Sequence, residues 1–398
     1  MSFFAKEDPY RLCDSVSRQV DKAFTLDIKN VPVNIAGIDF KGTRSESSKH
    51  TVFYPKVRQY EGGLFLPYLH KFHIPSNLLY EHVAYDSKLN PIILTNHLKP
   101  TAIGYKDHPL LPVYPFKSYK PVQKMKGDFY YMGLMNPHYG HLILESLSRY
   151  WAALKQPLLI DKATKFVFHI VGAHKDGALD YLFSGFRLPY LSALGITRDN
   201  IIIVDKPMEF ERITVPQAPV AISDGDCFSS QEVVSFWRFL NEKLASAYNC
   251  SSGVGPNKIY LSRRSVKNPI QGRTLLNETE VESFFEGAGF TIVAPEELDS
   301  IEQKHFILNH ARYIASHPGS GLLNSIFMKP GAHVLGLSCK PVLKYNPGLN
   351  HQIHMDIACN HKTFYYLSKL HSTNEDNLTW SVSINDIEQS LYKSDYLK

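Results

Sequence analysis

The stretch from Lys258 to Leu337 decides the fold. It contains KIYLSRR (258–264), RTLLNETEVESFFEGAGFTIVAPEELDSIEQ (273–303) and ARYIASHPGSGLLNSIFMKPGAHVLGL (311–337). Short apolar runs alternate here with helical patterns, which predicts strands, helices and a glycine-serine turn in the order of an α/β domain. Because such a domain holds phosphorylated ligands at the carboxyl ends of its parallel strands, we expect a diphosphate site in this stretch.

The pattern upstream indicates a second α/β domain. Apolar strands at 166–172, 201–205 and 212–216 alternate with helical segments, whereas residues 1 to about 125 are typical of strands and loops. A helix at about 231–248 precedes NCSSGVGPN, a Ser/Gly/Pro cluster typical of a linker. The sequence therefore predicts an N-terminal domain at 1–250, a C-terminal nucleotide-binding domain at 257–361 and a closing tail helix at 362–398.

The composition fits a globular chain of two ordinary domains. Its 398 residues are 44% hydrophobic and 20% charged, which excludes the disordered and fibrous classes. The net charge of +5 is mild for this length and favours phosphorylated ligands over a nucleic-acid duplex, which requires a concentrated basic patch. We therefore expect no nucleic-acid partner.

The cysteines and the hydrophobic runs of the sequence indicate the cellular compartment of the protein. The five cysteines are scattered without a CxxC pair, which argues against a disulfide framework and against a thiolate zinc site. The amino-terminal MSFFAKEDPYRLCDSVSRQ has charges before any signal-peptide core, and no run reaches the roughly 18 apolar residues of a membrane span. We expect a cytoplasmic protein whose only membrane contact is peripheral, at the inner face.

The glycine-serine turn and an arginine pair are the candidate phosphate ligands. Gly319, Ser320 and Gly321 lie between a predicted strand and a predicted helix, where a ligand can approach the backbone and a helix start attracts an anion. Arg263 and Arg264 end the strand KIYLS at the same sheet edge, and an arginine can bind phosphate oxygens bidentately. A tight turn and a solvated arginine pair are the structural alternatives, but the combination favours a phosphate site.

Acidic and amide residues follow the next strand, FTIVA. Glu296 lies directly after it, where a carboxylate often accepts hydrogen bonds from sugar hydroxyls. The alternative explanation is an acidic helix start stabilised by the helix dipole. Glu302 and Gln303 fit either helix capping or ligand binding.

A second constellation lies in the run NPHYGHLILESLSR. A helix that begins near Gly140 places His141 and Glu145 one turn apart, on an arc that also includes Ser148 and Arg149. A carboxylate beside an imidazole orients it and favours its protonated form, which suits proton abstraction from a hydroxyl near neutral pH. The alternative is an amphipathic helix whose polar face meets water or the other domain.

The chain contains the motifs YGHLILESLSRYW, LSRR, R-x-L-x-NE, GFTIVAPEEL, EQ, GSGLLN and IFMKPGAHV. Together these motifs resemble glycosyltransferase family 61, especially its bacterial capsular polysaccharide members. The resemblance implies an α/β, GT-B-like architecture, with two Rossmann-like domains facing across a cleft. It also implies inverting, metal-independent transfer from a nucleotide sugar to a glycan acceptor in capsular or lipopolysaccharide-type synthesis. Many members have His directly before the glycine turn, where this chain has Pro318 and places His317 one residue earlier.

The resemblance also assigns roles. The base is His141 oriented by Glu145, or Glu145 itself. Stabilisation of the leaving diphosphate falls to the arginines and the turn region: Arg263, Arg264, Gly319, Ser320, Gly321 and Asn324. No cofactor or metal is expected, because arginines and a helix dipole can offset the leaving charge. The expected partners are the nucleotide sugar and the glycan acceptor, with peripheral contact to the inner membrane surface or to polysaccharide-assembly machinery.

Three alternatives stay open. Asp224-Gly225-Asp226 fits the DxD pattern of metal-dependent transferases, although Asp-Gly is also a turn former. A metal-dependent hydrolase could use imidazole and thiol ligands from His138, His141, His351, His354 and Cys359. A transferase-like fold without activity could instead serve as a scaffold in polysaccharide assembly.

Overall fold

The computed structural model describes residues 24–27, 34–36, 49–68, 83–95, 122–135, 139–170, 177–222, 227–265, 274–317, 319–339, 348–368, 371–374, 377–393 and 396. The chain divides into two compact units, residues 1–25 with 50–236 and residues 26–49 with 237–398. Each unit has its own sheet and core. The boundary falls within α6 (Gln231–Ala247), which confirms the helix predicted at 231–248.

The second unit has a parallel sheet in the order β14-β12-β15-β16-β17-β2. Its strands are β2 (Asn34–Ala36), β12 (Lys258–Leu261), β14 (Thr291–Val293), β15 (Tyr313–Ser316), β16 (His333–Cys339) and β17 (Lys362–Ser368). Numbered along the chain from β12, the first five strands follow the order 2-1-3-4-5. This doubly wound order places ligands where the loops after its first and third strands diverge, here at β12 and β15.

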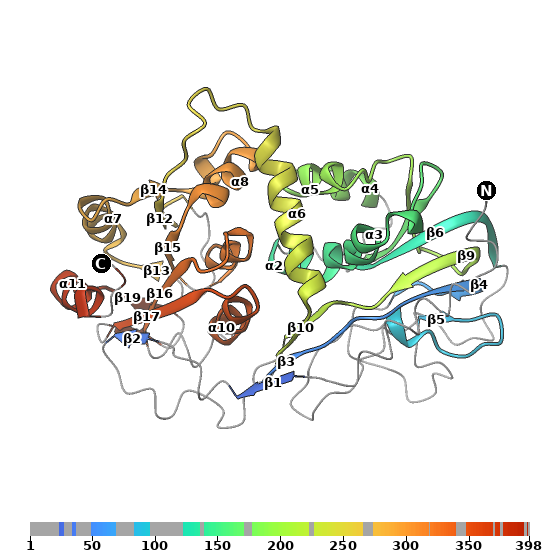
Figure 1. Ribbon diagram of the computed structural model, residues 1–398, viewed down its shortest axis with the longest axis horizontal. Coiled ribbons are helices and arrows are strands. Elements are labelled where there is room, and N and C mark those ends of the chain that lie inside the picture. Colours follow the sequence, from blue (N-terminus) through green and yellow to red (C-terminus); the bar gives the residue numbers. More distant parts are fainter. Residues whose placement is uncertain are drawn as a thin grey trace. The chain divides into compact units, whose positions relative to one another are not determined.

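Helices cover both faces of this sheet. They are α7 (Glu278–Gly287), α8 (Ile301–His310), α10 (Gly348–Ala358) and α11 (Ile384–Lys393), with 3-10 turns η7 (Pro295–Glu297) and η8 (Leu322–Phe327). Figure 1 shows α7 and α11 on one face and α8 and α10 on the other. The α/β class predicted from the sequence is confirmed, with parallel sheets that are compatible with a Rossmann-like fold.

The core of the second unit lies under α7 and α11. Val281 and Phe285 are one helical turn apart and are both fully buried. Phe285 stacks on Tyr260 of β12, with ring centroids 4.8 Å apart. The sequence prediction for 362–398 named only a closing helix, but this region also supplies β17, β18 (His371–Asn374) and β19 (Asn377–Trp380). β18 and β19 join β13 (Thr274–Leu275) in a small sheet.

The first unit has a mixed sheet in the order β5-β4-β9-β6-β7-β8. Its strands are β4 (Val57–Phe65), β5 (Ala84–Tyr85), β6 (Gln123–Met135), β7 (Lys165–Ile170), β8 (Ile201–Ile203) and β9 (Met208–Pro216). β6 to β9 pair in parallel, which confirms the three parallel strands predicted after residue 165. Because β7 and β8 lie on one side of β6 and β9 on the other, the strand order reverses at β6.

Smaller elements complete the first unit and its border. A second sheet has the order β1-β3-β11-β10, with β1 (Phe24–Asp27), β3 (Lys49–Val52), β10 (Val220–Ile222) and β11 (Cys227–Ser229). The short helices are α4 (Ala178–Leu182) and α5 (Arg187–Ala193), and the 3-10 turns are η2 (Ile93–Thr95) and η6 (Pro157–Leu159).

The segment after β6 changes helical type along its length. It consists of α2 (Tyr139–His141), the π-helical turn η4 (Leu142–Ser146), the 3-10 turn η5 (Leu147–Tyr150) and α3 (Trp151–Lys155). The wider π turn rotates every later side chain away from the regular 100° step. The predicted polar arc is therefore wrong in part: Ser148 and Arg149 are buried, whereas His141 and Glu145 stay partly exposed.

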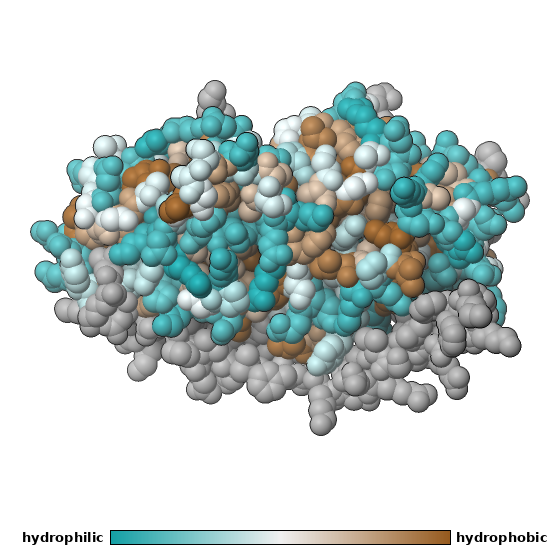
Figure 2. All heavy atoms as spheres, turned by 45° about the horizontal axis from the view of Figure 1, so that its top comes forward, coloured by the Kyte–Doolittle hydropathy of each residue, from teal (hydrophilic) through white to brown (hydrophobic). Residues whose placement is uncertain are grey.

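The helices and the surface bear on possible membrane contact. Within the described ranges, none of the helices combines the length and apolar character needed to cross a membrane. Figure 2 shows hydrophilic residues over much of one face, with hydrophobic residues in several separate groups. Peripheral membrane contact stays a prediction.

Candidate functional site

The carboxyl ends of β12 and β15 meet side by side in the second unit. Leu261 and Ser316 are paired across the two strands, and Ser316 Oγ donates to the Leu261 carbonyl at 2.8 Å. Arg263 follows β12 by two residues, and His317 follows β15 directly. The structure thus brings the arginine pair and the glycine turn to one edge of the sheet, at the point where the strand order reverses.

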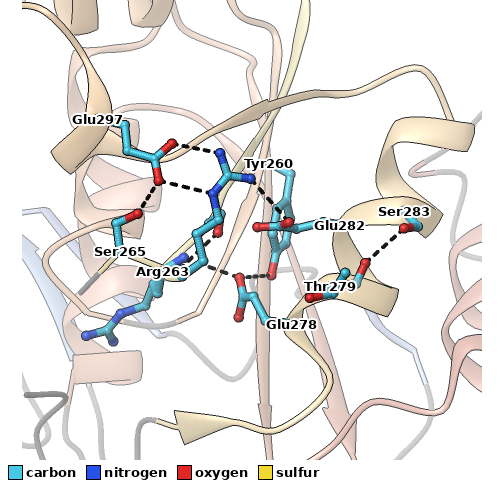
Figure 3. A network of polar contacts seen from close by, with 10 residues as sticks. Tyr260, Arg263, Ser265, Glu278, Thr279, Glu282, Ser283 and Glu297 are labelled. Atoms are coloured by element: carbon cyan, nitrogen blue, oxygen red, sulfur yellow. Dashed lines mark hydrogen bonds and ion pairs between the residues drawn. The ribbon is translucent and has the colours of Figure 1, made fainter. Parts of the chain in front are cut away.

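Arg263 presents a cation at this edge. Its main-chain N–H donates to Glu278 Oε1 at 3.2 Å. Its guanidinium forms no hydrogen bond or ion pair with any residue in the described ranges, and Figure 3 shows it pointing away from Glu278. Burial lowers the pKa of Arg263, while the charges of Glu296 and Glu278 raise it. Since an arginine stays charged even after a moderate decrease, this side chain is available to an anion.

Arg264 is instead held by carboxylates. Its guanidinium donates to Glu297 at 2.7 and 3.2 Å and to Glu282 at 3.3 Å, in the network of Figure 3. The hydrogen bonds from Arg264 and Ser265 lower the pKa of Glu297 to about 2. A phosphate contact by Arg264 would require breaking these pairs, so the two neighbouring arginines differ in their availability.

The glycine turn leaves its backbone accessible. Gly319 has φ +133°, a value that favours glycine. Gly321 has an ordinary φ of −64°, and among the described residues a Cβ there would meet only Ser316 Oγ, at 3.8 Å. Neither backbone conformation nor packing therefore requires glycine at 321. The missing side chain leaves room beside the main chain, as a ligand needs.

Hydrogen bonds within the turn fix its shape. Asn324 is buried, and its side-chain amide donates to the carbonyls of Gly321 at 2.8 Å and Ser320 at 3.2 Å. The N–H groups of Ser320 and Gly321 make no hydrogen bond within the part of the chain that the structure describes. The following helix is the six-residue 3-10 turn η8, so its dipole is smaller than that of the helix expected from the sequence.

Glu278 and His317 are site residues that sequence reasoning did not assign. Glu278 Oε1 accepts from the Tyr260 hydroxyl at 2.9 Å, and Glu278 Oε2 lies 2.9 Å from His317 Nε2. Burial raises the pKa of Glu278, but the hydrogen bond and charge of His317, with the Arg263 N–H and the Tyr260 hydroxyl, lower it overall. Both residues lie inside motifs visible in the sequence, but only the strand order shows that they meet.

α8 adds a buried lysine beside Glu296. Lys304 is 7% exposed, and burial lowers its pKa to about 7. The negative charge of Glu296 acts in the opposite direction and raises this pKa. Ile301, Lys304 and Leu308 share one helical face, so the spacing in the sequence is enough to indicate that Lys304 faces the core. At the start of α8, Gln303 accepts from the Asp299 N–H at 2.9 Å and donates its own N–H to Ser300 at 3.1 Å. Of the two roles open to Gln303, the structure shows capping.

A buried polar network anchors η8 behind the turn. Ser325 Oγ and Gln352 Nε2 donate to Asp356 Oδ1 at 2.9 and 2.8 Å, and Thr363 donates to Oδ2 at 3.2 Å. His361 Nε2 contacts the Ser325 carbonyl at 2.9 Å. Since Asp356 is fully buried, burial raises its pKa to about 7 despite the three donors.

Asp356→Asn is expected to change how stability depends on pH. The folded protein holds a proton on Asp356 between the ordinary carboxyl pKa of 3.8 and about 7, and the unfolded chain releases it. Stability is therefore lost as pH rises through this window, by on the order of 1.4 kcal/mol per pH unit. Asn keeps an acceptor for Ser325 and does not titrate. We expect its melting temperature, relative to wild type, to increase by on the order of 5 °C from pH 5 to pH 8 in calorimetry.

Asp386→Asn, at an exposed position of α11, is the matched control for this prediction and should follow the wild-type profile. Parallel pH profiles of wild type and Asp356→Asn would show that Asp356 does not titrate in this window.

His141 and Glu145 form the candidate base in the first unit. His141 Nδ1 lies 2.8 Å from Glu145 Oε1, with side chains 42% and 22% exposed, as the predicted one-turn spacing requires. They lie in α2 and η4, shortly after the carboxyl end of β6, where the order of that sheet reverses. π turns are frequent at functional positions. With Nδ1 held by the carboxylate, Nε2 is the nitrogen suited to take a proton.

Buried contacts fix this segment to β6, η2 and β9. Ser146 Oγ donates to the Leu134 carbonyl at 2.7 Å, and the Arg149 guanidinium donates to the Leu94 and Pro216 carbonyls. Gly133 has φ +93°, and a Cβ there would lie 2.6 Å from Arg149 Nε. Arg149 is therefore a structural residue, and its buried contacts hold in place the segment that follows His141.

A comparison with known protein families covers both candidate clusters, His141 with Glu145 and Arg263 with the glycine turn. Residues 139–335 match the family model described as Glycosyltransferase 61.

Residues 139–335 belong to glycosyltransferase family 61. The family 61 segment includes His141 and Glu145 near its start, and Arg263 and the glycine turn further along. Family membership indicates a glycosyltransferase, with a sugar donor and a glycan acceptor. No curated protein matches the chain.

The described residues give little support to the metal-binding alternatives. Asp224, Asp226 and His138 lie outside the described residues, as does the side chain of His351. His354 and Cys359 are both buried, and burial raises the pKa of the Cys359 thiol. Across the described ranges, no group of three or more His, Cys, Asp or Glu side chains could hold a metal ion.

Proposed function

We propose that this protein is an inverting, metal-independent glycosyltransferase of GT-B type. It would transfer a sugar from a nucleotide-sugar donor to a glycan acceptor in capsular or lipopolysaccharide-type synthesis, in the cytoplasm or at the inner membrane face. The observation that carries the proposal is the meeting of Arg263 with the Gly319–Gly321 turn at the carboxyl ends of β12 and β15. This is where a doubly wound sheet binds a diphosphate.

The donor half of the proposed site has three parts. The Arg263 guanidinium neutralises the diphosphate, and the N–H groups of Ser320 and Gly321 donate to its oxygens. Glu296, exposed after β14, accepts from hydroxyls of the ribose or the sugar. Asn324 supports this arrangement by holding the turn carbonyls, rather than by reaching the ligand itself.

The proposed reaction is a single displacement. The acceptor hydroxyl attacks the anomeric carbon while the bond to the diphosphate oxygen breaks, and the bonding pair leaves with the nucleoside diphosphate. The hydroxyl proton passes to His141 Nε2, and Glu145 stabilises the resulting imidazolium. Attack opposite the leaving group inverts the configuration.

The test of the proposal is the release of nucleoside diphosphate from a panel of nucleotide sugars, with and without EDTA. We expect one donor to release its diphosphate in the presence of a glycan acceptor, at the same rate with the chelator present. Arg263 and the turn N–H groups offset the leaving charge without a divalent ion.

Each alternative gives a different result in this assay. Loss of activity with EDTA, restored by Mn²⁺ or Mg²⁺, would favour the Asp224-Gly225-Asp226 motif or a metal-dependent hydrolase. No release from any donor, and no thermal stabilisation by any nucleoside diphosphate, would favour the scaffold.

A further inference from the structure

We propose that His317, held by Glu278, contacts the donor diphosphate and donates a hydrogen bond to it from Nδ1. This inference rests on the proposed function and extends its donor half. It concerns the second unit alone.

His317 lies between the two parts of the proposed phosphate site. It follows β15 directly and precedes Gly319 by two residues. The pairing of Leu261 with Ser316 places it beside the segment that carries Arg263. The Glu278 carboxylate joins both, since it accepts the Arg263 main-chain N–H at 3.2 Å and lies 2.9 Å from His317 Nε2.

Burial leaves one nitrogen of His317 without a partner. The side chain is 3% exposed, and its other nitrogen, Nδ1, has no hydrogen-bond partner among the described residues. The ring edge contacts Trp380, with centroids 5.3 Å apart, which closes its apolar side. Because buried polar atoms are nearly always hydrogen bonded, Nδ1 calls for an additional acceptor, and a phosphate oxygen fits that need.

The groups that face His317 come from α7, β12 and β19. Glu278 of α7 places its Oε2 2.9 Å from His317 Nε2. From β12, the Tyr260 hydroxyl faces the same carboxylate and the Arg263 guanidinium opposes a second cation. From β19, Trp380 is neutral. An arriving diphosphate adds two or more negative charges and outweighs this opposition.

A purely structural role predicts something different. A Glu278–His317 pair that only fastens β15 to α7 would affect folding, but it would not make anion affinity depend on pH. The pH dependence of anion binding therefore separates the two roles.

The experiment measures binding of inorganic pyrophosphate to the full chain by calorimetry from pH 6 to pH 8.5. His317→Asn is expected to weaken binding about 10-fold at pH 6 and less than about 2-fold at pH 8.5, because a protonated imidazole attracts phosphate more strongly than a neutral one. The pyrophosphate affinity of the wild type is expected to fall as the pH rises, and Glu278→Gln should move this fall to lower pH. His310→Asn, at the carboxyl end of α8 and bonded to the Phe306 carbonyl, is the matched control and should bind as wild type.

The controls separate this inference from the proposed function. If Arg263→Gln loses affinity at every pH while His317→Asn binds as wild type at pH 6, the inference is overturned and the donor site stands. If the wild type binds neither pyrophosphate nor any nucleoside diphosphate, the proposed function itself fails. Should His317→Asn not fold, spectra of ¹³C-labelled histidine in the wild type give the answer. One ring signal should shift on adding pyrophosphate at pH 6 and should not shift in Glu278→Gln, and unshifted signals in the wild type would refute the contact.

Discussion

His141→Ala is expected to lower the rate of sugar transfer by about 10²- to 10⁴-fold, the usual contribution of a positioned general base. The reason is that an uncharged hydroxyl is a poor nucleophile until a base accepts its proton. Nucleoside diphosphate affinity should stay within about 2-fold of wild type, because His141 belongs to the first unit and the proposed diphosphate ligands belong to the second. Single-turnover kinetics with the donor found in the panel, and calorimetry with its nucleoside diphosphate, measure the two quantities.

Glu145→Gln distinguishes the two candidate bases. If His141 is the base and Glu145 orients it at 2.8 Å, glutamine should retain part of the activity, since its amide can still hold the ring. If Glu145 itself is the base, Glu145→Gln should be as damaging as His141→Ala. A His141→Ala protein with activity within a few-fold of wild type would remove His141 from the mechanism.

Arg263→Ala is expected to weaken nucleoside diphosphate binding by about 10²-fold and to lower kcat/KM by at least as much. Charge-assisted contacts to phosphate are worth about 1.5–3 kcal/mol each, and those that strengthen as the diphosphate leaves add to the effect on rate. Calorimetry and steady-state kinetics at saturating acceptor measure the two losses. Stability should change little, because the guanidinium makes no hydrogen bond among the described residues.

Arg264→Ala is the matched control for this prediction. Its guanidinium is exposed and already paired with Glu297 and Glu282, so its removal should change diphosphate affinity by less than about 3-fold. Equal losses from both substitutions would mean that Arg264 leaves its carboxylates when the donor binds. Unchanged affinity in Arg263→Ala would count against the site at β12 and β15.

The sequence predicted much of the second unit because its signals are local. Strand runs such as KIYL and helices such as α7 follow from spacing alone, and the arginine pair falls where a strand ends. Spacing also placed His141 one turn from Glu145. These features depend on residues within a few positions of each other.

The features that the sequence could not predict depend on long-range pairing or on a local irregularity. The contact of Glu278 with His317 requires β12 and β15 to be neighbours, although β14 lies between them in the chain. The different fates of Arg263 and Arg264 depend on which carboxylates each can reach. The π turn at η4 is a third case, since one additional residue in a turn leaves the hydrophobic pattern almost unchanged while it moves Arg149 into the core.

The strand β2 limits how the donor-binding half could be prepared as a fragment. It comes from residues 34–36 but pairs in parallel with β17, far along the chain. A fragment that starts at Trp237 would leave the backbone of β17 unsatisfied along that edge, which invites self-association through strand addition. A soluble fragment would have to carry residues 26–49 as well, for example fused behind the carboxyl terminus by a flexible tether in a permuted gene.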